Sequence, residues 1–204
     1  MDLDFPEELI LKKNNNIINE VLKKKVSITI ENIILEEDYE NNISKIMCML
    51  NFHGKSKKKI KIEAQGNGVV DAFFNAIFHE FADNFVSLKN VKLDDFIVKV
   101  QFKKSKKPLQ TDAPVEIKIV LENTTRKKIY FKCRAGSLVQ AATGAVCQAV
   151  THLINAELAV IQLHKDIMNA QKRQRPDLVS DYTSQLVELV KTVSYSSVIE
   201  KETK

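Results

Sequence analysis

Apolar and polar residues alternate along six short segments of the chain, which fall into two groups of three. The first group covers 26–34, 43–52 and 59–64, and the second covers 93–102, 115–122 and 128–134. Alternation with a period of two is typical of β-strands that bury one face. Short polar segments separate the strands within each group, which favours antiparallel pairing. The pattern therefore predicts two three-stranded antiparallel sheets.

A helical pattern follows each group of strands. The turn over 66–68, Gly-Asn-Gly, leads directly into a helix that extends to about residue 84. Asp71 falls in the first turn of this helix, where a carboxylate suits the helix dipole. The second helix runs from 138 to about 171. Exposed N–H groups at such a helix start can hold an anionic group, and the alternative is a strand-to-helix turn without a ligand.

The two groups, each with its helix, are copies of one unit. The constant shift in numbering that takes Val70 to Val139 superposes them, so that 70–72 lie over 139–141. Each unit has one apolar sheet face and one helix to cover it. We therefore expect an α+β fold: two pseudo-symmetric βββα units with antiparallel three-stranded sheets covered by helices, plus extra N- and C-terminal helices.

The segments outside the repeat also have helical patterns. Residues 7–24 predict a helix that is interrupted, or starts late, at Asn14-Asn15-Asn16, and 177–193 predict a last helix. We expect the tail from 194 to 204 to be frayed. The predicted domains are an N-terminal helical connector (1–25), a two-unit domain (26–156, with units 26–84 and 93–156) and a C-terminal helical extension (157–204).

The second helix carries a face of small residues. These residues are Ala141, Ala142, Gly144, Ala145 and Ala149. Small side chains let a helix approach another backbone closely, which favours tight packing inside the monomer. The alternative interpretation is a crevice for a small apolar ligand.

Length and charge exclude some classes of protein. The 204 residues suffice for one domain or two small ones. No run approaches the ~18 apolar residues of a membrane helix, and the N-terminus is not a signal peptide, so we expect a cytoplasmic protein without a membrane partner. The net charge of +5 raises the possibility of nucleic-acid binding. However, no aromatic residues interleave with the lysine clusters as a base-stacking platform requires, so the clusters are better interpreted as solvated loops.

The reactive side chains do not form a recognisable catalytic or metal site. Cys48, Cys133 and Cys147 have no metal-like spacing, so we expect buried, reduced thiols. The four histidines form no HxH or HxxxH pair, which favours surface or packing roles. No nucleophile and base stand in a catalytic arrangement. We therefore expect no enzyme activity on this chain alone, no metal and no cofactor.

Three motifs, in order, resemble those of a known family. Residues 66–76 are close to Gly-Asn-Gly-Pro-Val-Asp-Ala followed by two further residues, often with an aromatic, and then Asn-Ala. Residues 93–96 match a Leu-x-Asp-Tyr-like strand, and 111–113 with 116–117 match Thr-Asp-Ala followed by Glu-Val. Over roughly 26–156 the chain resembles the C-terminal regulatory domain of 2-isopropylmalate synthase, which citramalate synthase shares.

The sequence departs from the family pattern at three positions. Val69 replaces the proline of the first motif, and Phe74 stands where tyrosine is usual. Ser137 stands where the family has an aspartate at the start of the last helix.

The resemblance implies a regulatory domain that dimerises and binds leucine or isoleucine for feedback control of branched-chain amino-acid biosynthesis. Backbone N–H groups around 66–68 and a helix N-terminus would hold the effector's carboxylate. Asp71 or Asp112 would take its ammonium group, and the small-residue face with Phe74 would enclose its side chain. The expected effector-binding residues are Gly66, Asn67, Gly68, Asp71, Ala72, Phe74, Asp112, Ala113, Ser137, Ala141, Ala142 and Ala145.

The family's catalytic half has no counterpart in this sequence. That half is a (β/α)8 barrel with a His-x-His metal site, and the chain lacks the pair and is too short for a barrel of ~250 residues. The chain is then a fragment of a synthase or a free-standing protein, and Met1 and the terminal helices favour the latter. Expected partners are the effector, a second copy and a separate synthase chain. The alternative function is a structural interaction module that has lost the ligand.

Overall fold

The computed structural model of the protein describes residues 6–54, 56–100 and 114–202. They form two three-stranded antiparallel sheets, each followed by a helix, with further helices at both ends of the chain. The predicted α+β fold of two βββα units is thereby confirmed.

The first sheet has strand order β1 (Ser27–Asp38), β2 (Ile43–His53) and β3 (Lys57–Gly66). The central strand β2 buries every second residue from Ser44 to Leu50, and Cys48 and Leu50 are 1% and 0% exposed. A bulge between Ile30 and Asn32 shifts the register of β1 against β2. The alternation seen in the sequence is therefore the alternation between the helix-facing and solvent-facing sides of this sheet.

The second sheet has strand order β4 (Val91–Val100), β5 (Val115–Asn123) and β6 (Lys128–Ala135). Three residues of the central strand, Ile117, Ile119 and Leu121, are fully buried. The last two residues of the strand predicted over 93–102 lie outside the described residues.

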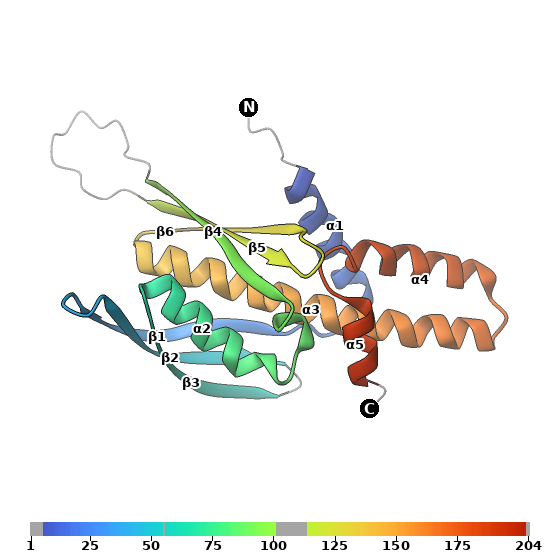
Figure 1. Ribbon diagram of the computed structural model, residues 1–204. Coiled ribbons are helices and arrows are strands. Elements are labelled where there is room, and N and C mark those ends of the chain that lie inside the picture. The colour runs from blue at the N-terminus through green and yellow to red at the C-terminus, as the bar shows by residue number, and fades with distance from the viewer. Residues whose placement is uncertain (1–5, 55, 101–113, 203–204) are drawn as a thin grey trace.

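The helices α2 (Val69–Ala82) and α3 (Leu138–Lys172) form a layer between the two sheets. Figure 1 shows this arrangement, with β4–β6 on one side of the helices and β1–β3 on the other. Helix α2 packs mainly on β3 and β2, whereas α3 packs on β5, β6 and β1 and also on α2. The core of the protein therefore lies on both sides of the helix layer.

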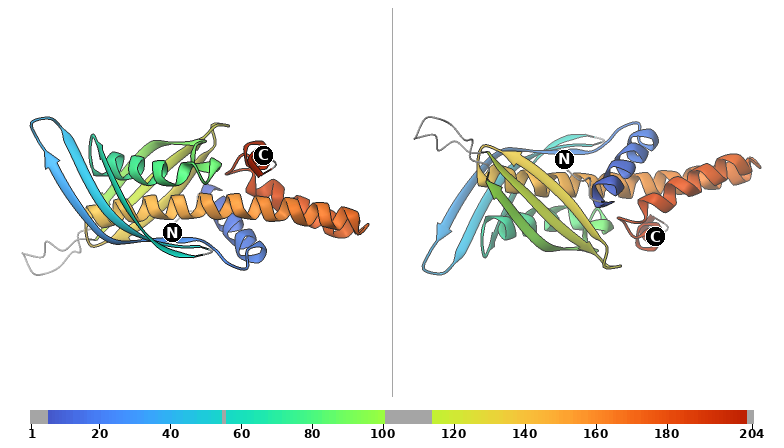
Figure 2. Two further views of the ribbon diagram at one scale, coloured as in Figure 1. Left: turned by 90° about the horizontal axis from the view of Figure 1, so that it is seen from below. Right: turned by 90° about the horizontal axis from the view of Figure 1, so that it is seen from above.

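Helix α3 is 35 residues long and extends beyond both sheets (Figures 1 and 2). It is long and apolar enough to cross a membrane, but 72% of its apolar 18-residue window is buried inside the protein. Its hydrophobicity is therefore that of a core helix. The helix predicted from 138 to about 171 is confirmed.

The N-terminal helix α1 (Pro6–Val21) is continuous, so the predicted interruption at three consecutive asparagines was wrong. Asn14 is fully buried and donates from Nδ2 to Thr192 Oγ1 at 3.0 Å, and Asn15 contacts His152. These tertiary contacts offset the low helix propensity of asparagine. Ile18, 3% exposed, anchors the same helix in the core.

The C-terminal helices differ from the prediction in two ways. Helix α4 (Pro176–Leu189) packs against α3 and ends before the predicted limit near Val193. The tail predicted to fray contains the helix α5 (Tyr195–Glu202). Val198 is 1% exposed, and Lys201 Nζ donates to the carbonyl of Asp83 at 3.1 Å just after α2. The expectation of a frayed tail was wrong because these contacts come from distant parts of the chain.

Candidate functional site

The Gly-Asn-Gly turn before α2 is closed by the side chain of Asp71. Its Oδ2 accepts from the N–H of Asn67 at 3.0 Å, and its Oδ1 accepts from Asn75 Nδ2 at 3.0 Å. A Cβ at Gly66 would lie 2.5 Å from Asp71 Oδ2 and 2.6 Å from the backbone nitrogen of Ala72. Gly68 has φ 146°, which other residues rarely adopt. Both glycines are thus needed for the turn to wrap around the carboxylate.

At the start of α3, a serine side chain caps the helix. The Ser137 hydroxyl accepts from the N–H of Gln140 at 3.1 Å, which caps the helix. In the superposition of the repeat, Gly66 and Asp71 correspond to Ala135 and Gln140. In the first turn of α3, Gln140 replaces the aspartate whose side chain folds back over the turn before α2. Ala135, the counterpart of Gly66, therefore has room for its Cβ.

The expected site residues fall into three groups in the structure. The glycine turn, Asp71 and Ser137 lie partly or fully exposed at the starts of α2 and α3. Ala72, Ala141, Ala142 and Ala145 are each 0% exposed in the core, and Phe74, 9% exposed, stacks on Phe78 at a centroid distance of 3.9 Å. Asp112 and Ala113 lie outside the described residues. The buried alanines therefore serve close packing of the helix layer.

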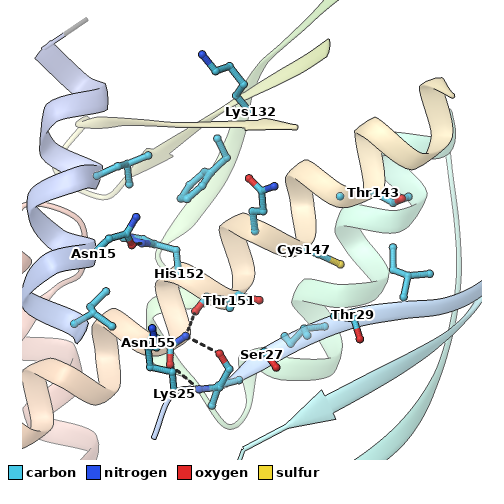
Figure 3. Close-up of a pocket in the computed structure, with 18 of the residues that line it drawn as sticks. Asn15, Lys25, Ser27, Thr29, Lys132, Thr143, Cys147, Thr151, His152 and Asn155 are labelled. Atoms are coloured by element: carbon cyan, nitrogen blue, oxygen red, sulfur yellow. Dashed lines mark hydrogen bonds between the residues drawn. The ribbon is translucent and has the colours of Figure 1, made fainter. Parts of the chain in front are cut away.

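A large groove of about 1620 Å³ runs along the flank of α3 that α2 does not cover. Its walls are α1, β1, β6 and one face of α3, as the close-up in Figure 3 shows. The α3 face presents small and polar residues from the first turn onwards. They are Val139, Gln140, Thr143, Gly144, Cys147, Gln148, Thr151, His152 and Asn155.

A close approach of α3 to β6 shapes the floor of the groove. A Cβ at Gly144 would lie 2.7 Å from Cys133 Sγ. The helix therefore lies closer to the strand here than any larger residue would allow without a shift of that side chain. Gly144 therefore serves close packing, as expected from its position in the small-residue face of the helix.

Two polar residues fix the end of the groove near β1. Asn155 donates from Nδ2 to the carbonyl of Val26 and accepts from the Val26 N–H, both at 2.8 Å (Figure 3). His152 Nδ1 lies 3.0 Å from Asn15 Oδ1, and its ring packs against Phe131 at a centroid distance of 5.5 Å. Burial lowers the pKa of His152 to about 4, so the imidazole is neutral at physiological pH.

The groove is basic at one end. Lys23, Lys24 and Lys25 line it between α1 and β1, and Lys132 lines it from β6. Among the lining residues described, the one carboxylate is that of Glu31, which pairs with Lys59 at 2.7 Å. The electrostatic balance therefore favours a ligand or partner surface that carries negative charge.

The three cysteines are free thiols in the structure, as expected from the sequence. Cys48 and Cys147 are buried, but Cys133 is partly exposed, which corrects the prediction that all three are buried. Burial raises the pKa of Cys48 to about 11 and that of Cys147 to about 12. Both stay protonated at neutral pH, and Cys147 contributes a compact apolar surface to the groove.

Within the described ranges, no group of three or more His, Cys, Asp or Glu side chains is placed to hold a metal ion. The groove thus offers shape, hydrogen-bonding groups and positive charge.

Sequence reasoning missed the residues of the groove because it followed the apolar face of α3. A signal was present: Gln140, Thr143, Cys147, Thr151 and Asn155 recur at intervals of three or four along a largely buried helix. Residues at this spacing share one face. A stripe of polar residues on an otherwise apolar helix indicates a flank that the monomer leaves open.

The comparisons with known proteins identify the family. A model of the LeuA allosteric (dimerisation) domain matches residues 14–155, which include both sheets, α2 and the first half of α3. A comparison with curated protein sequences gave no match. The matched segment covers more than half of the chain and contains the glycine turn, both helix starts and most of the groove. The chain therefore belongs to the family of LeuA allosteric (dimerisation) domains.

Proposed function

We propose that this protein is an allosteric regulatory module that dimerises through the open flank of α3 and binds a branched-chain amino acid, leucine or isoleucine, for feedback control of their biosynthesis. The observation that carries the proposal is the groove of about 1620 Å³ along α3, in a chain of the LeuA allosteric (dimerisation) family. The effector and the pathway are inferred from the family resemblance.

The architecture supports dimerisation through this flank. Helix α3 has α2 on one side and the groove on the other, so the helix layer is open on that side. A two-fold axis beside α3 would place α3 of one copy against α3 of the other and continue the layer. Such an interface is self-complementary, as two-fold dimers require.

The effector fits best where the groove meets the first turns of α3. The exposed amide of Gln140 offers hydrogen-bonding groups there, and Val139 and Gly144 offer apolar surface and space, whereas the Thr143 hydroxyl already donates to the Val139 carbonyl at 2.8 Å. Lys23, Lys24 and Lys25 lie at the other end of the groove, beside Val26 and Asn155, so their charge would attract an amino-acid carboxylate towards the groove without contacting it at this position. An effector between two copies would couple binding to the geometry of the dimer, which is the requirement for allosteric control.

Two measurements test the proposal separately. Sedimentation equilibrium should give twice the chain mass, and Gln140→Arg with Gln148→Arg should shift the protein to monomer because like charges would meet across the axis. Both side chains are exposed in the monomer, so the variant should fold. His79→Arg, exposed on α2, is the matched control and should remain dimeric. A monomeric wild type would rule out the dimer.

Calorimetric titration with leucine, isoleucine and valine tests the effector. Saturable heat with at least one of them, and none with glycine, is the expected result. No heat with any of the three would exclude a branched-chain effector and favour a second function.

That second function is a dimerisation scaffold that has lost the ligand, and the turn before α2 favours it. The N–H of Asn67 donates to Asp71 there, so this donor is not available to a ligand's carboxylate in this conformation. A dimer without effector binding in the two measurements above would support the scaffold.

A further inference from the structure

A smaller cavity, of about 390 Å³, lies where α1, the β5–β6 turn and the end of α4 meet. Ligand pockets have volumes of about 300–1,000 Å³, so this one has room for a small molecule. Part of its wall lies outside the segment 14–155 that matches the family: Ile10 and Leu11 come from α1, and Lys191 follows α4. The cavity therefore combines the family domain with both terminal extensions of this chain.

The wall of this cavity carries four cationic residues and, among the residues described, no carboxylate. The cations are Arg126, Lys127, Lys128 and Lys191. Lys128 is paired with Asp94 at 2.8 Å and Lys191 with Glu188, but no ion pair of the other two occurs within the described part of the chain. Arg126 and Lys127 are both exposed, so their charged groups are accessible to a ligand. Two positive charges of the wall are thus left for an anion to neutralise.

Arg126 has a backbone conformation that arginine rarely adopts. Its φ is 59°, in the left-handed region, where a hairpin turn favours glycine or asparagine. Such a conformation persists only where the surrounding structure imposes it, and residues of this kind gather at binding sites. An arginine at a position where glycine would be more stable indicates that its guanidinium group has a function.

The turn holds Arg126 in this conformation through Asn123. Asn123 Oδ1 accepts from the N–H groups of Thr125 at 3.0 Å and Lys127 at 2.9 Å. The N–H of Arg126 donates to the Asn123 carbonyl at 2.9 Å. These bonds fix the backbone from which both exposed cations extend, so less conformational entropy is lost when they bind a ligand.

The other walls of the cavity are fastened to each other. Asn123 Nδ2 donates to the carbonyl of Lys191 at 3.4 Å, which joins the turn to the end of α4, and Asn14 Nδ2 donates to Thr192 Oγ1 at 3.0 Å, which joins α1 to the same segment. The Thr192 hydroxyl also donates to the Leu189 carbonyl, so it is not available to a ligand. The cavity is therefore preformed, and its ligand would depend on the cations.

We propose that this cavity binds a phosphate group, either free or as part of a small organic molecule, through Arg126 and Lys127. A planar guanidinium group can donate two parallel hydrogen bonds to a phosphate. A phosphate monoester carries a charge of about −1.5 to −2 at pH 7, which matches two uncompensated cations better than the single charge of a carboxylate. The apolar part of the wall would accommodate an organic group and consists of Ile10, Leu11 and Ile129.

This site goes beyond the proposed regulatory function and does not depend on it. The proposed effector is an amino acid in the groove along α3, whereas this ligand is a phosphate at the opposite side of α1 from most of that groove. Loss of either site leaves the residues of the other in place, apart from Leu11 and Tyr130, which line both.

A titration followed by ¹H–¹⁵N NMR tests the site directly. Sodium phosphate and, separately, glycerol 3-phosphate are added up to about 10 mM at constant ionic strength, a range that detects millimolar affinity. Saturable shifts of the amides of 124–128 and 191–192 are expected with one or both, and the stronger ligand distinguishes free phosphate from an ester. Sodium acetate should bind at least severalfold more weakly than phosphate. Absence of saturable shifts with both phosphates, or equal binding of acetate, would overturn the proposal.

A glycine variant separates binding from folding. Arg126→Gly removes the guanidinium group and places the favoured residue at φ 59°, so phosphate binding should weaken at least tenfold while the melting temperature without ligand stays equal or rises. Arg173→Gly removes the same charge at the exposed far end of α3 and should leave binding unchanged.

A second variant tests the other cation without altering the turn. Lys127→Gln should weaken phosphate binding severalfold, because its charge is lost while its N–H can still donate to Asn123. Binding of phosphate at wild-type affinity by Arg126→Gly and Lys127→Gln would refute the site. A lower melting temperature of Arg126→Gly would show that the arginine serves the fold, which would also contradict the proposal.

Discussion

The side-chain amide of Asn155 forms two hydrogen bonds with the backbone of Val26, the residue that directly precedes β1. Asn155 Nδ2 donates to the Val26 carbonyl and its Oδ1 accepts from the Val26 N–H, each at 2.8 Å. Both residues are buried, with 4% and 7% of their surface exposed. The pair attaches the first sheet to α3 at the end of the groove.

We expect Asn155→Ala to lower the free energy of unfolding by about 2–4 kcal/mol, because the N–H and carbonyl of Val26 would stay buried without partners. Asn169→Ala, at an exposed position of the same helix, is the control and should change it by less than ~0.5 kcal/mol. Urea unfolding at fixed protein concentration measures both. Equal midpoints for wild type and Asn155→Ala would show that the pair contributes nothing to stability.

Gly66→Ala should destabilise the protein by about 1–3 kcal/mol, because the new methyl group would meet Asp71 Oδ2 and the backbone of Ala72. The atoms it would meet stand at 2.5 Å and 2.6 Å, and the second belongs to a rigid helix start. Thermal unfolding provides the comparison with Gly136→Ala, the control.

Gly136 is a matched control because nothing lies within 4 Å of a Cβ built there. Its substitution should alter stability by less than ~0.5 kcal/mol. Equal melting temperatures for Gly66→Ala and Gly136→Ala would show that the close fit around Asp71 does not require glycine at position 66.

His152 should make stability fall as the pH falls from about 6.5 to about 4. Burial lowers its pKa to about 4 in the folded protein, whereas the unfolded chain has the ordinary value of 6.5. Between these values the unfolded state binds more protons, so acid favours unfolding, by roughly 3 kcal/mol at the lower limit.

The test compares His152→Gln with wild type across this pH range. Wild type should lose more stability than the variant as the pH falls, because only wild type has the buried imidazole. The exposed His53→Gln serves as the control and should follow wild type. Parallel curves for wild type and His152→Gln would contradict the assignment of the effect to His152.

Val198→Ala should weaken the docking of α5. Val198 is 1% exposed, so its truncation removes buried apolar surface and leaves a cavity at a cost of about 1.5–3 kcal/mol. Hydrogen exchange of the α5 amides should accelerate at least about tenfold, since 1.4 kcal/mol corresponds to a factor of ten. Val187→Ala, 55% exposed on α4, is the control and should leave these amides unchanged. Unaltered exchange in Val198→Ala would mean that α5 is held by other contacts.

The fold could be predicted from the sequence where local pattern and burial agree. Ile117, Ile119 and Leu121 alternate in the sequence and are all fully buried, because β5 is a central strand with one face on the helices. The internal repeat also predicted the order of strands and helices, because each unit has one apolar sheet face that a helix must cover.

The prediction was wrong where distant contacts decide the local structure. The asparagines of α1 and the sparse apolar residues of α5 have weak helical patterns, and both helices are held by partners far along the chain. Asn14, for example, is bonded to Thr192. The groove was not foreseen for the same reason: β1, β6 and α1 meet beside α3 only in the folded chain.

The uninterrupted length of α3 makes it a lever. Its 35 residues span about 50 Å at ~1.5 Å per residue. The first half lines the groove, and the second half carries α4 beyond the sheets. Beyond the last groove residue, Asn155, the helix extends for about 26 Å, so a rotation of about 5° at this point would move its far end by about 2 Å. Closure of the groove would therefore displace the far end of α3, where a second protein could bind.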